Sequence, residues 1–301
     1  MIQSIALTHQ LPVANTLGEG VIWDHNSQTT YWTDIQNNVL YSWKFAATSV
    51  QQYPCPERLG CFGFTSEHGW LICAFETGFA FFHPISGQTE WIAKIESDLL
   101  HTRLNDGRVD RQGRFWAGTM MQDEGVDESK HKAALYRLEH DKSVTRVIDQ
   151  VKVSNGLCWS PKGDVMYFAD SPTQTISQSR LDILTGEIGP LTDFAHTNNE
   201  VFPDGSCVDS EGCIWNAQWG SSTVKRYSPE GKVLLVLDTP CLQPTCVAFG
   251  GPNLQHLIVT SARQNINSVH INAEPANGDV FVFQTPYTGL QESICTLSRS
   301  I

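Results

Sequence analysis

NDGRVDRQGRFW, residues 105–116, is one of six related stretches that recur along this chain of 301 residues. Each stretch has a small or polar residue, then apolar residues, a short turn, and an aromatic or apolar strand. The other five are EGVIWDHNSQTTYW from Glu19, CFGFTSEHGWL from Cys61, NGLCWSPKGDVMYF from Asn155, DGSCVDSEGCIW from Asp204 and TCVAFGGPNLQHL from Thr245. When they are aligned on the turn, successive copies lie 42, 44, 50, 49 and 41 residues apart. A period in this range indicates supersecondary units that are stacked or arranged in a ring.

The pattern within one repeat is that of short strands. In the first repeat these are residues 21–23, 30–34, 39–43 and 49–53, with Gly, Asp, Asn and Ser in the turns. Four strands in each of six repeats predict an all-β fold, a six-bladed propeller with four-stranded blades, formed by residues 1–301 as a single domain. The segment Ser4–Val13 precedes the first repeat, and we expect it to close the ring as the outer strand of the last blade.

Composition excludes several classes of function. The net charge of −12 argues against a nucleic-acid partner, because such proteins carry a basic patch. The sequence contains no run of about 18 apolar residues, so no membrane helix is predicted. The first twenty residues also lack the pattern of a signal peptide. Nine cysteines occur without a CxxC pair, and we interpret them as buried, reduced core residues. These observations predict a cytoplasmic protein and leave its oligomeric state open.

One position of the repeat carries Glu, Asp or Asn in four of its six copies. In a propeller the first strand of each blade lines the central channel, so Glu19, Asn155 and Asp204 are expected to converge there. Their oxygens suit hard divalent cations such as calcium, magnesium and manganese. An alternative is that Asn155 and Asp204, each followed by Gly, only cap turns. A turn role does not require the same phase in every repeat, so we predict a divalent metal in the channel, with coordination positions open for catalysis.

Two further residues are expected at the channel mouth. Asn105 occupies the same repeat position, and Arg103 precedes it by one strand alternation. Both side chains suit the hydroxyls and ring oxygens of a polar ligand. The alternative for Arg103 is a buried ion pair with a channel carboxylate. No GxSxG, phosphate-loop, dinucleotide or EF-hand motif offers a competing chemistry.

The longest break in the repeat is Gln122–Lys132, QDEGVDESKHK. Its polar and charged composition is typical of a solvated hairpin tip. The other interpretation is a mobile cover over one face of the ring, since long loops in ordered proteins are often lids.

Four stretches together resemble the regucalcin/gluconolactonase family, also called the senescence-marker and luciferin-regenerating family. They are LGEGVIWD at 17–24, RLNDGRVDRQGRFWAGTM at 103–120, SNGLCWSPKGDVMYFADS at 154–171 and FPDGSCVDSEGCIWNAQWG at 202–220. The resemblance implies a six-bladed propeller with one divalent cation in its channel, bound by Glu19, Asn155 and Asp204. It also implies Arg103 and Asn105 as substrate contacts. By spacing, a further acidic contact of animal members falls on Asp123, with Glu124 beside it.

The resemblance implies metal-dependent hydrolysis of a sugar lactone to an aldonic acid. Asp204 would act as general base, the metal would polarise the lactone carbonyl, and Trp219 is a candidate for stacking on the sugar. Calcium or zinc is expected first, with manganese, magnesium and iron(II) as further candidates. One alternative is a calcium-binding regulatory protein of regucalcin type without turnover. Another is hydrolysis of other esters or organophosphates, as in more distant six-bladed relatives.

Overall fold

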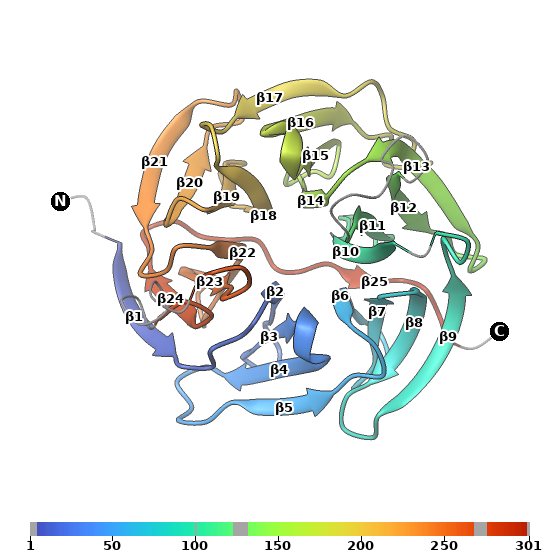
Figure 1. Ribbon diagram of the computed structural model, residues 1–301, viewed down its shortest axis with the longest axis horizontal. Coiled ribbons are helices and arrows are strands. Elements are labelled where there is room, and N and C mark those ends of the chain that lie inside the picture. The colour runs from blue at the N-terminus through green and yellow to red at the C-terminus, as the bar shows by residue number, and fades with distance from the viewer. Residues whose placement is uncertain (1–4, 100, 123–131, 268–275, 300–301) are drawn as a thin grey trace.

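The computed structural model describes residues 5–99, 101–122, 132–267 and 276–299. In these residues the chain forms six sheets arranged around a central channel, as Figure 1 shows. Five of the sheets have four strands, and the sixth has four strands with a short fifth strand added. The prediction of an all-β propeller with six four-stranded blades is therefore confirmed.

The first strand of each repeat lies innermost, and consecutive inner strands contact one another around the described ring. The inner strands are β2 (Gly18–Asp24), β6 (Leu59–Thr65), β10 (Thr102–Val109), β14 (Ser154–Trp159), β18 (Phe202–Val208) and β22 (Pro244–Gly250). The second strands are β3 (Thr29–Asp34), β7 (Leu71–Phe75), β11 (Phe115–Met121), β15 (Val165–Asp170), β19 (Ile214–Trp219) and β23 (His256–Ser261).

The two outer strands complete each blade. The third strands are β4 (Val39–Lys44), β8 (Gly78–His83), β12 (Ala133–Leu138), β16 (Thr175–Arg180), β20 (Thr223–Tyr227) and β24 (Val280–Gln284). The outermost strands are β5 (Gln51–Pro54), β9 (Gln88–Lys94), β13 (Val144–Val151), β17 (Thr192–His196), β21 (Val233–Asp238) and β1 (Ala6–Leu11). Two short 3₁₀ turns, η1 (Ile35–Asn37) and η2 (Ser171–Thr173), follow β3 and β15.

One blade combines the two ends of the chain. β1 pairs antiparallel with β24, with Ala6 opposite Gln284 and Leu11 opposite Val280. The side chain of Thr8 donates a hydrogen bond to the carbonyl of Val282 at 2.9 Å. An N-terminal strand therefore lies outermost in a blade whose other three strands come late in the sequence.

Large apolar side chains fill the space between neighbouring blades. Trp23, Trp32 and Trp43 of the first blade pack in one cluster with Cys246 and Ile258 of the last. Each side chain of this size contributes about 1.5–3 kcal/mol when it is fully buried. All nine cysteines are free, and eight of them are buried. Their predicted role as small core residues is confirmed.

An aspartate fixes the hairpin turn of the inner strand in two blades. The backbone N–H groups of Gln112 and Arg114 donate to Asp110 Oδ1 at 2.9 and 3.0 Å, and Trp116 Nε1 donates to its Oδ2 at 2.9 Å. Asp209 accepts the equivalent three hydrogen bonds in its own turn. The recurring D-x-x-G-x-x-W pattern is therefore a structural device at the turn end of the blades.

The C-terminal segment crosses the turn end of the channel. Figure 1 shows it running through the centre of the ring to β25 (Ile294–Cys295), which pairs in parallel with β6. Glu292 forms an ion pair of 3.1 Å with Arg108 of β10, and Arg299 bonds Glu67 and Glu90. This C-terminal segment, called the strap below, covers the end of the channel at which the inner strands finish. Among the described residues, no helix is long and apolar enough to cross a membrane.

Candidate metal and substrate site

The inner strands change register where the aligned polar residues stand. The β2–β3 pairing slips after Glu19, the β14–β15 pairing slips after Asn155, and the β18–β19 pairing slips around Asp204. Such a bulge bends the strand and redirects the neighbouring side chain. Gly20 and Gly156 follow with φ angles of 59° and 67°, in a region that glycine enters without strain. Gly20 and Gly156 therefore allow the bulge that directs the side chains of Glu19 and Asn155.

Three polar residues from different blades are buried together near the starts of their strands. Glu19, Asn155 and Asp204 are 7%, 6% and 5% exposed. Burial raises the pKa of Glu19 to about 8, and the charge of Asp106 is the second cause. Burial also raises the pKa of Asp204 well above its usual range, followed by the charges of Glu19 and Asp106. An acidic neighbour raises the pKa of a carboxyl group when it lies close by, so these buried carboxyl groups share one part of the channel.

A chain of hydrogen bonds connects the channel mouth to these residues. Arg103 Nη1 donates to Asn105 Oδ1 at 2.8 Å, and Asn105 Nδ2 donates to Asn155 Oδ1 at 3.0 Å. Asn155 Nδ2 in turn donates to Ser171 Oγ at 2.8 Å, and that hydroxyl donates to the carbonyl of Pro203 at 2.8 Å. Because the amide nitrogen of Asn155 is occupied, its carbonyl oxygen is held facing Asn105 and keeps a second lone pair.

The donor set fits a divalent cation. Asp204 Oδ1 is buried and has no hydrogen-bond partner among the described residues. An unpaired carboxylate oxygen beside two further buried carboxylates is costly unless protons or a cation neutralise it. Glu19, Asn155 and Asp204 offer only oxygens, which are the ligands of hard cations. The channel therefore has both the charge and the donor chemistry of a metal site.

Arg103 lies beside this set without pairing directly with it. Its side chain is 3% exposed, and its Nη1 bonds the Leu104 carbonyl as well as Asn105. In the described part of the chain it has no ion pair within 4 Å, so the alternative of a direct pair with a channel carboxylate is not seen there. Burial lowers the pKa of Arg103 to about 10, with Arg58 as the second cause. The guanidinium is therefore still a cation at neutral pH.

Asp106 is a site residue that the sequence reasoning missed. It follows Asn105 on β10, is 9% exposed, and accepts a hydrogen bond from the Leu157 backbone N–H at 3.1 Å. It therefore joins β10 to the ligand-bearing strand β14. The available signal was an acidic residue immediately after the aligned Asn105, but a one-residue step along a regular strand points to the opposite face. The bulge in β10 invalidates that simple alternation.

Three other positions noted in the sequence have packing roles. Thr245 Oγ1 donates to the Gly18 carbonyl at 2.5 Å, which links β22 to β2, and lies 2.8 Å from the Thr260 hydroxyl. Cys61 is buried in a core cluster, and burial raises the pKa of its thiol. Trp219 packs against a small cluster that includes Leu17.

Two expectations fall outside the described residues. Asp123 and Glu124 lie there, and so does the central part of Gln122–Lys132, residues 123–131. The acidic substrate contact at Asp123 and the choice between a hairpin tip and a cover therefore stay predictions.

A second group of acidic residues is already neutralised. Potential ligand atoms of Asp209, Glu211 and Cys213 lie within 4.8 Å of one another. However, Arg226 Nε donates to Asp209 Oδ2 at 2.8 Å, and its Nη2 bonds Glu211 at 2.5 Å. Asp209 also holds the hairpin turn described above. This group is an ion-paired turn, and the channel set is the better candidate for a metal.

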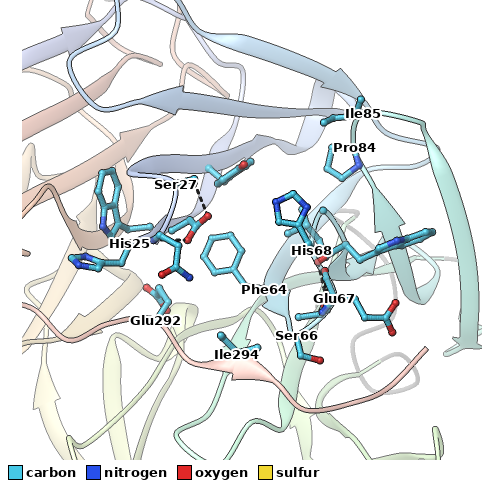
Figure 2. Close-up of a pocket in the computed structure, with 18 of the residues that line it drawn as sticks. His25, Ser27, Phe64, Ser66, Glu67, His68, Pro84, Ile85, Glu292 and Ile294 are labelled. Carbon is cyan, nitrogen blue, oxygen red and sulfur yellow. Dashed lines mark hydrogen bonds between the residues drawn. The ribbon is translucent and has the colours of Figure 1, made fainter. Parts of the chain in front are cut away.

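Two cavities lie on different sides of the ring. The larger, about 500 Å³, is lined by the turn that ends β2 and by Glu292 and Ile294 of the strap. Figure 2 shows Phe64 in its centre, with His25 and Glu292 on one side and His68 on the other. This cavity therefore lies at the end of the channel where the inner strands finish, whereas Glu19 lies near the start of β2. A second cavity of about 420 Å³ includes Arg103 and thus adjoins the channel site.

The fold and the site together define a class: six-bladed β-propellers with a buried, oxygen-rich site at one end of the channel. The chain belongs to the SMP-30/Gluconolactonase/LRE-like family, whose sequence model matches residues 17–263. The chain is 37% identical to L-arabinolactonase of Azospirillum brasilense over 92% of this chain and 91% of that protein. It is 34% identical to 6-deoxy-6-sulfogluconolactonase of Pseudomonas putida, over 93% and 95% of the two chains.

Solved structures agree with this family. The calcium-binding protein regucalcin from Agrobacterium tumefaciens strain C58 superposes with a TM-score of 0.90 and 29% sequence identity. The alignment covers 97% of this chain and 98% of that one. The resemblance noted from the sequence is confirmed. The two curated relatives are, by name, hydrolases of lactone ester bonds.

Proposed function

We propose that this protein hydrolyses a sugar lactone to its aldonic acid, using one divalent cation held by Glu19, Asn155 and Asp204. The observation that carries the proposal is the buried Asp204 Oδ1, which has no hydrogen-bond partner in the described ranges and lies with Glu19 and Asp106 in one part of the channel. A structural channel would be expected to bury apolar or fully paired groups there. The names of the family's lactonase relatives support the reaction class.

A divalent cation bound by these oxygens would supply Lewis acidity to the lactone carbonyl and its developing oxyanion. The chain's own residues supply the rest. Asp204 would be kept ionised by the bound cation, and its carboxylate could then accept the proton of an attacking water as a general base. Asn216 donates to the Asp204 backbone carbonyl at 2.6 Å, which fixes the strand that carries this carboxylate.

Arg103 and Asn105 are proposed to hold the hydroxyls of the lactone ring. Both are buried on β10 and are bonded to each other, so few rotamers remain for a ligand to fix. Preorganised donors of this kind lower the entropy cost of placing the carbonyl near the attacking water. Asp123 is proposed as a further contact on the grounds of the family resemblance alone.

The experiment uses chelated protein that is reloaded with calcium, zinc, manganese, magnesium or iron(II) in turn. Gluconolactone, galactonolactone, xylonolactone and arabinonolactone are supplied, and acid release is followed with a pH indicator. We expect release that needs metal and exceeds spontaneous hydrolysis. No metal-dependent release with any lactone would overturn the proposal.

A cation-binding role without turnover is the second candidate, and the calcium-binding regucalcin neighbour favours it. The same panel separates the two functions. Tight calcium binding by calorimetry together with no acid release supports the second function. An aryl ester or organophosphate hydrolysed much faster than every lactone would point to a third.

A further inference from the structure

The cavity beside Arg103 opens between the second and third blades. Its 420 Å³ is within the range of small-molecule sites, and its lining includes the end of β9, the start of β10, and residues 95–97 and 99. Arg103 lines the inner end of the cavity. Hydrogen bonds through Asn105 connect it to Asn155, one of the proposed metal ligands. Among the described residues, Arg103 Nε and Nη2 have no hydrogen-bond partner, although the side chain is 3% exposed. The cavity thus shares Arg103 with the proposed lactone site, and this residue offers donors that no described residue accepts from.

Glu96 provides the free acceptor of the same cavity. Its Oε1 accepts hydrogen bonds from Thr119 Oγ1 at 3.0 Å and from the Tyr136 hydroxyl at 2.7 Å. Its Oε2 is shielded from water and has no donor in the described part of the chain. The backbone at Glu96 has a φ of 50°, a conformation that costs free energy for a residue with a side chain and that tends to occur at functional sites. The carboxylate is therefore held firmly by one oxygen while the other lacks a hydrogen bond.

The remaining charged groups of the cavity wall neutralise one another. Glu57 Oε1 accepts from Lys94 at 3.0 Å, and its Oε2 accepts from the Thr77 hydroxyl at 2.7 Å. Glu76 is paired with Arg58. In the part of the chain that the structure describes, Glu96 is left as a carboxylate with an oxygen to offer and with no cation bonded to it.

We propose that Glu96 is a specificity-determining residue that accepts a hydrogen bond from a hydroxyl on the lactone's tail, the carbons furthest from the carbonyl. A hydroxyl of the substrate would supply the hydrogen bond that Oε2 lacks among the described residues, while Arg103 holds an oxygen at the inner end. The substrate class is then a neutral, hydroxylated lactone. A phosphate or sulfonate on the tail is disfavoured, because it offers no donor to Glu96 and sets like charges side by side.

This inference rests on the proposed lactonase function, and its test compares two substrates that differ only by a phosphate group on the tail. Gluconolactone and 6-phosphogluconolactone are compared with wild-type protein and with Glu96→Gln. Loss of a hydrogen bond to a charged group should lower kcat/KM for gluconolactone roughly 10- to 100-fold, mainly through KM. The preference for gluconolactone over the phosphorylated lactone should fall by about tenfold.

Glu57→Gln is the matched control. It removes a carboxylate from the same cavity, but both oxygens of Glu57 are occupied, so KM for gluconolactone should change by less than about twofold. Thermal melting confirms that each variant is folded, and Glu96→Asp serves if Glu96→Gln is not. An unchanged KM in Glu96→Gln, or a wild-type preference for the phosphorylated lactone, would overturn the inference.

Failure of the proposed function is distinguishable from failure of this inference. If the wild type hydrolyses no lactone of the panel, the function fails, and the cavity is tested by calorimetric binding of glucose, a neutral polyhydroxy ring without a lactone bond. Weaker glucose binding by Glu96→Gln than by the wild type supports the role of Glu96. Equal binding by the two proteins contradicts it.

Discussion

The side-chain amide of Asn105 donates to Asn155 Oδ1 at 3.0 Å, although 50 residues separate the two in sequence. Asn105 also accepts from Arg103, so one residue touches both a proposed substrate contact and a proposed metal ligand. Binding of substrate and binding of metal should therefore influence each other through Asn105.

Asn105→Ala removes both of these hydrogen bonds. The guanidinium of Arg103 loses an acceptor, and the Asn155 carbonyl loses the donor that orients it. We expect kcat/KM for a sugar lactone to fall roughly 10- to 100-fold, because hydrogen bonds to charged groups are worth about 1.5–3 kcal/mol. Metal affinity, measured by calorimetry, should fall as well. The double variant with Arg103→Ala should lose less than the sum of the single losses in free energy, and strict additivity would contradict the coupling.

Asp204→Asn tests the general base while preserving shape. Removal of a catalytic base typically lowers the rate by about 10²–10⁴-fold, so acid release should approach the uncatalysed rate. Two oxygen ligands remain, and metal content measured by elemental analysis should drop without disappearing. Glu211→Gln is the control, because Glu211 belongs to the ion-paired turn and should leave turnover unchanged. Full activity in Asp204→Asn would falsify the proposed mechanism.

Removal of the metal should make stability depend on pH. In the metal-free protein the pKa of Glu19 is raised to about 8 by burial and by Asp106, whereas an unfolded chain ionises this group near 4.5. Between these values the folded state binds more protons than the unfolded one, so stability falls as pH rises. Added metal requires the ionised carboxylates and should offset this loss.

Melting temperatures at pH 5, 6.5 and 8, with chelator and with metal, measure the effect. A shift of this size corresponds to about 3–5 kcal/mol for one group, or roughly 5 °C for a chain of this length. The increase that metal confers should be larger at pH 8 than at pH 5. The same increase at every pH would contradict neutralisation of the buried carboxylates.

The N-terminal strand should stabilise the whole ring. Deletion of residues 1–14 removes β1 and exposes the outer edge of β24, and we expect the melting temperature to fall by roughly 5 °C or more. Leu11→Ala should act in the same direction by about 2–5 kcal/mol, because Leu11 is 7% exposed. Leu7→Ala is the matched control on the same strand and should have little effect, since Leu7 is 45% exposed. Unchanged melting after the deletion would show that the ring closes without β1.

The fold was predictable because each repeat states the same local pattern. The apolar residues, the turn residues and the second strand recur in all six stretches. The D-x-x-G-x-x-W turns at Asp110 and Asp209 form through contacts within a few residues. Burying one face of such a unit requires a neighbour of the same kind. A period of about forty residues with four strands then leaves few arrangements other than a ring.

Parts of the site could not be predicted in this way. Asp106 is directed into the channel by a bulge, and strand alternation alone would place it on the other face. Glu96 lies between β9 and β10, outside the six repeated stretches. Its hydrogen-bond donors Thr119 and Tyr136 come from β11 and β12. Neither residue has a local signature, because its environment is assembled from side chains that are distant in sequence.

The sequence by itself determined the number of blades, the strands that line the channel and the phase at which Glu19, Asn155 and Asp204 recur. Local hydrogen bonding and apolar periodicity suffice for these features, since both depend on neighbouring residues. Only the tertiary structure decided that Asp204 keeps an oxygen that no described residue donates to, that Asn105 connects Arg103 to Asn155, and that a cavity with Glu96 opens beside them. Burial, unmet hydrogen bonds and cavities depend on how separate blades pack against one another, and no single stretch of chain specifies that.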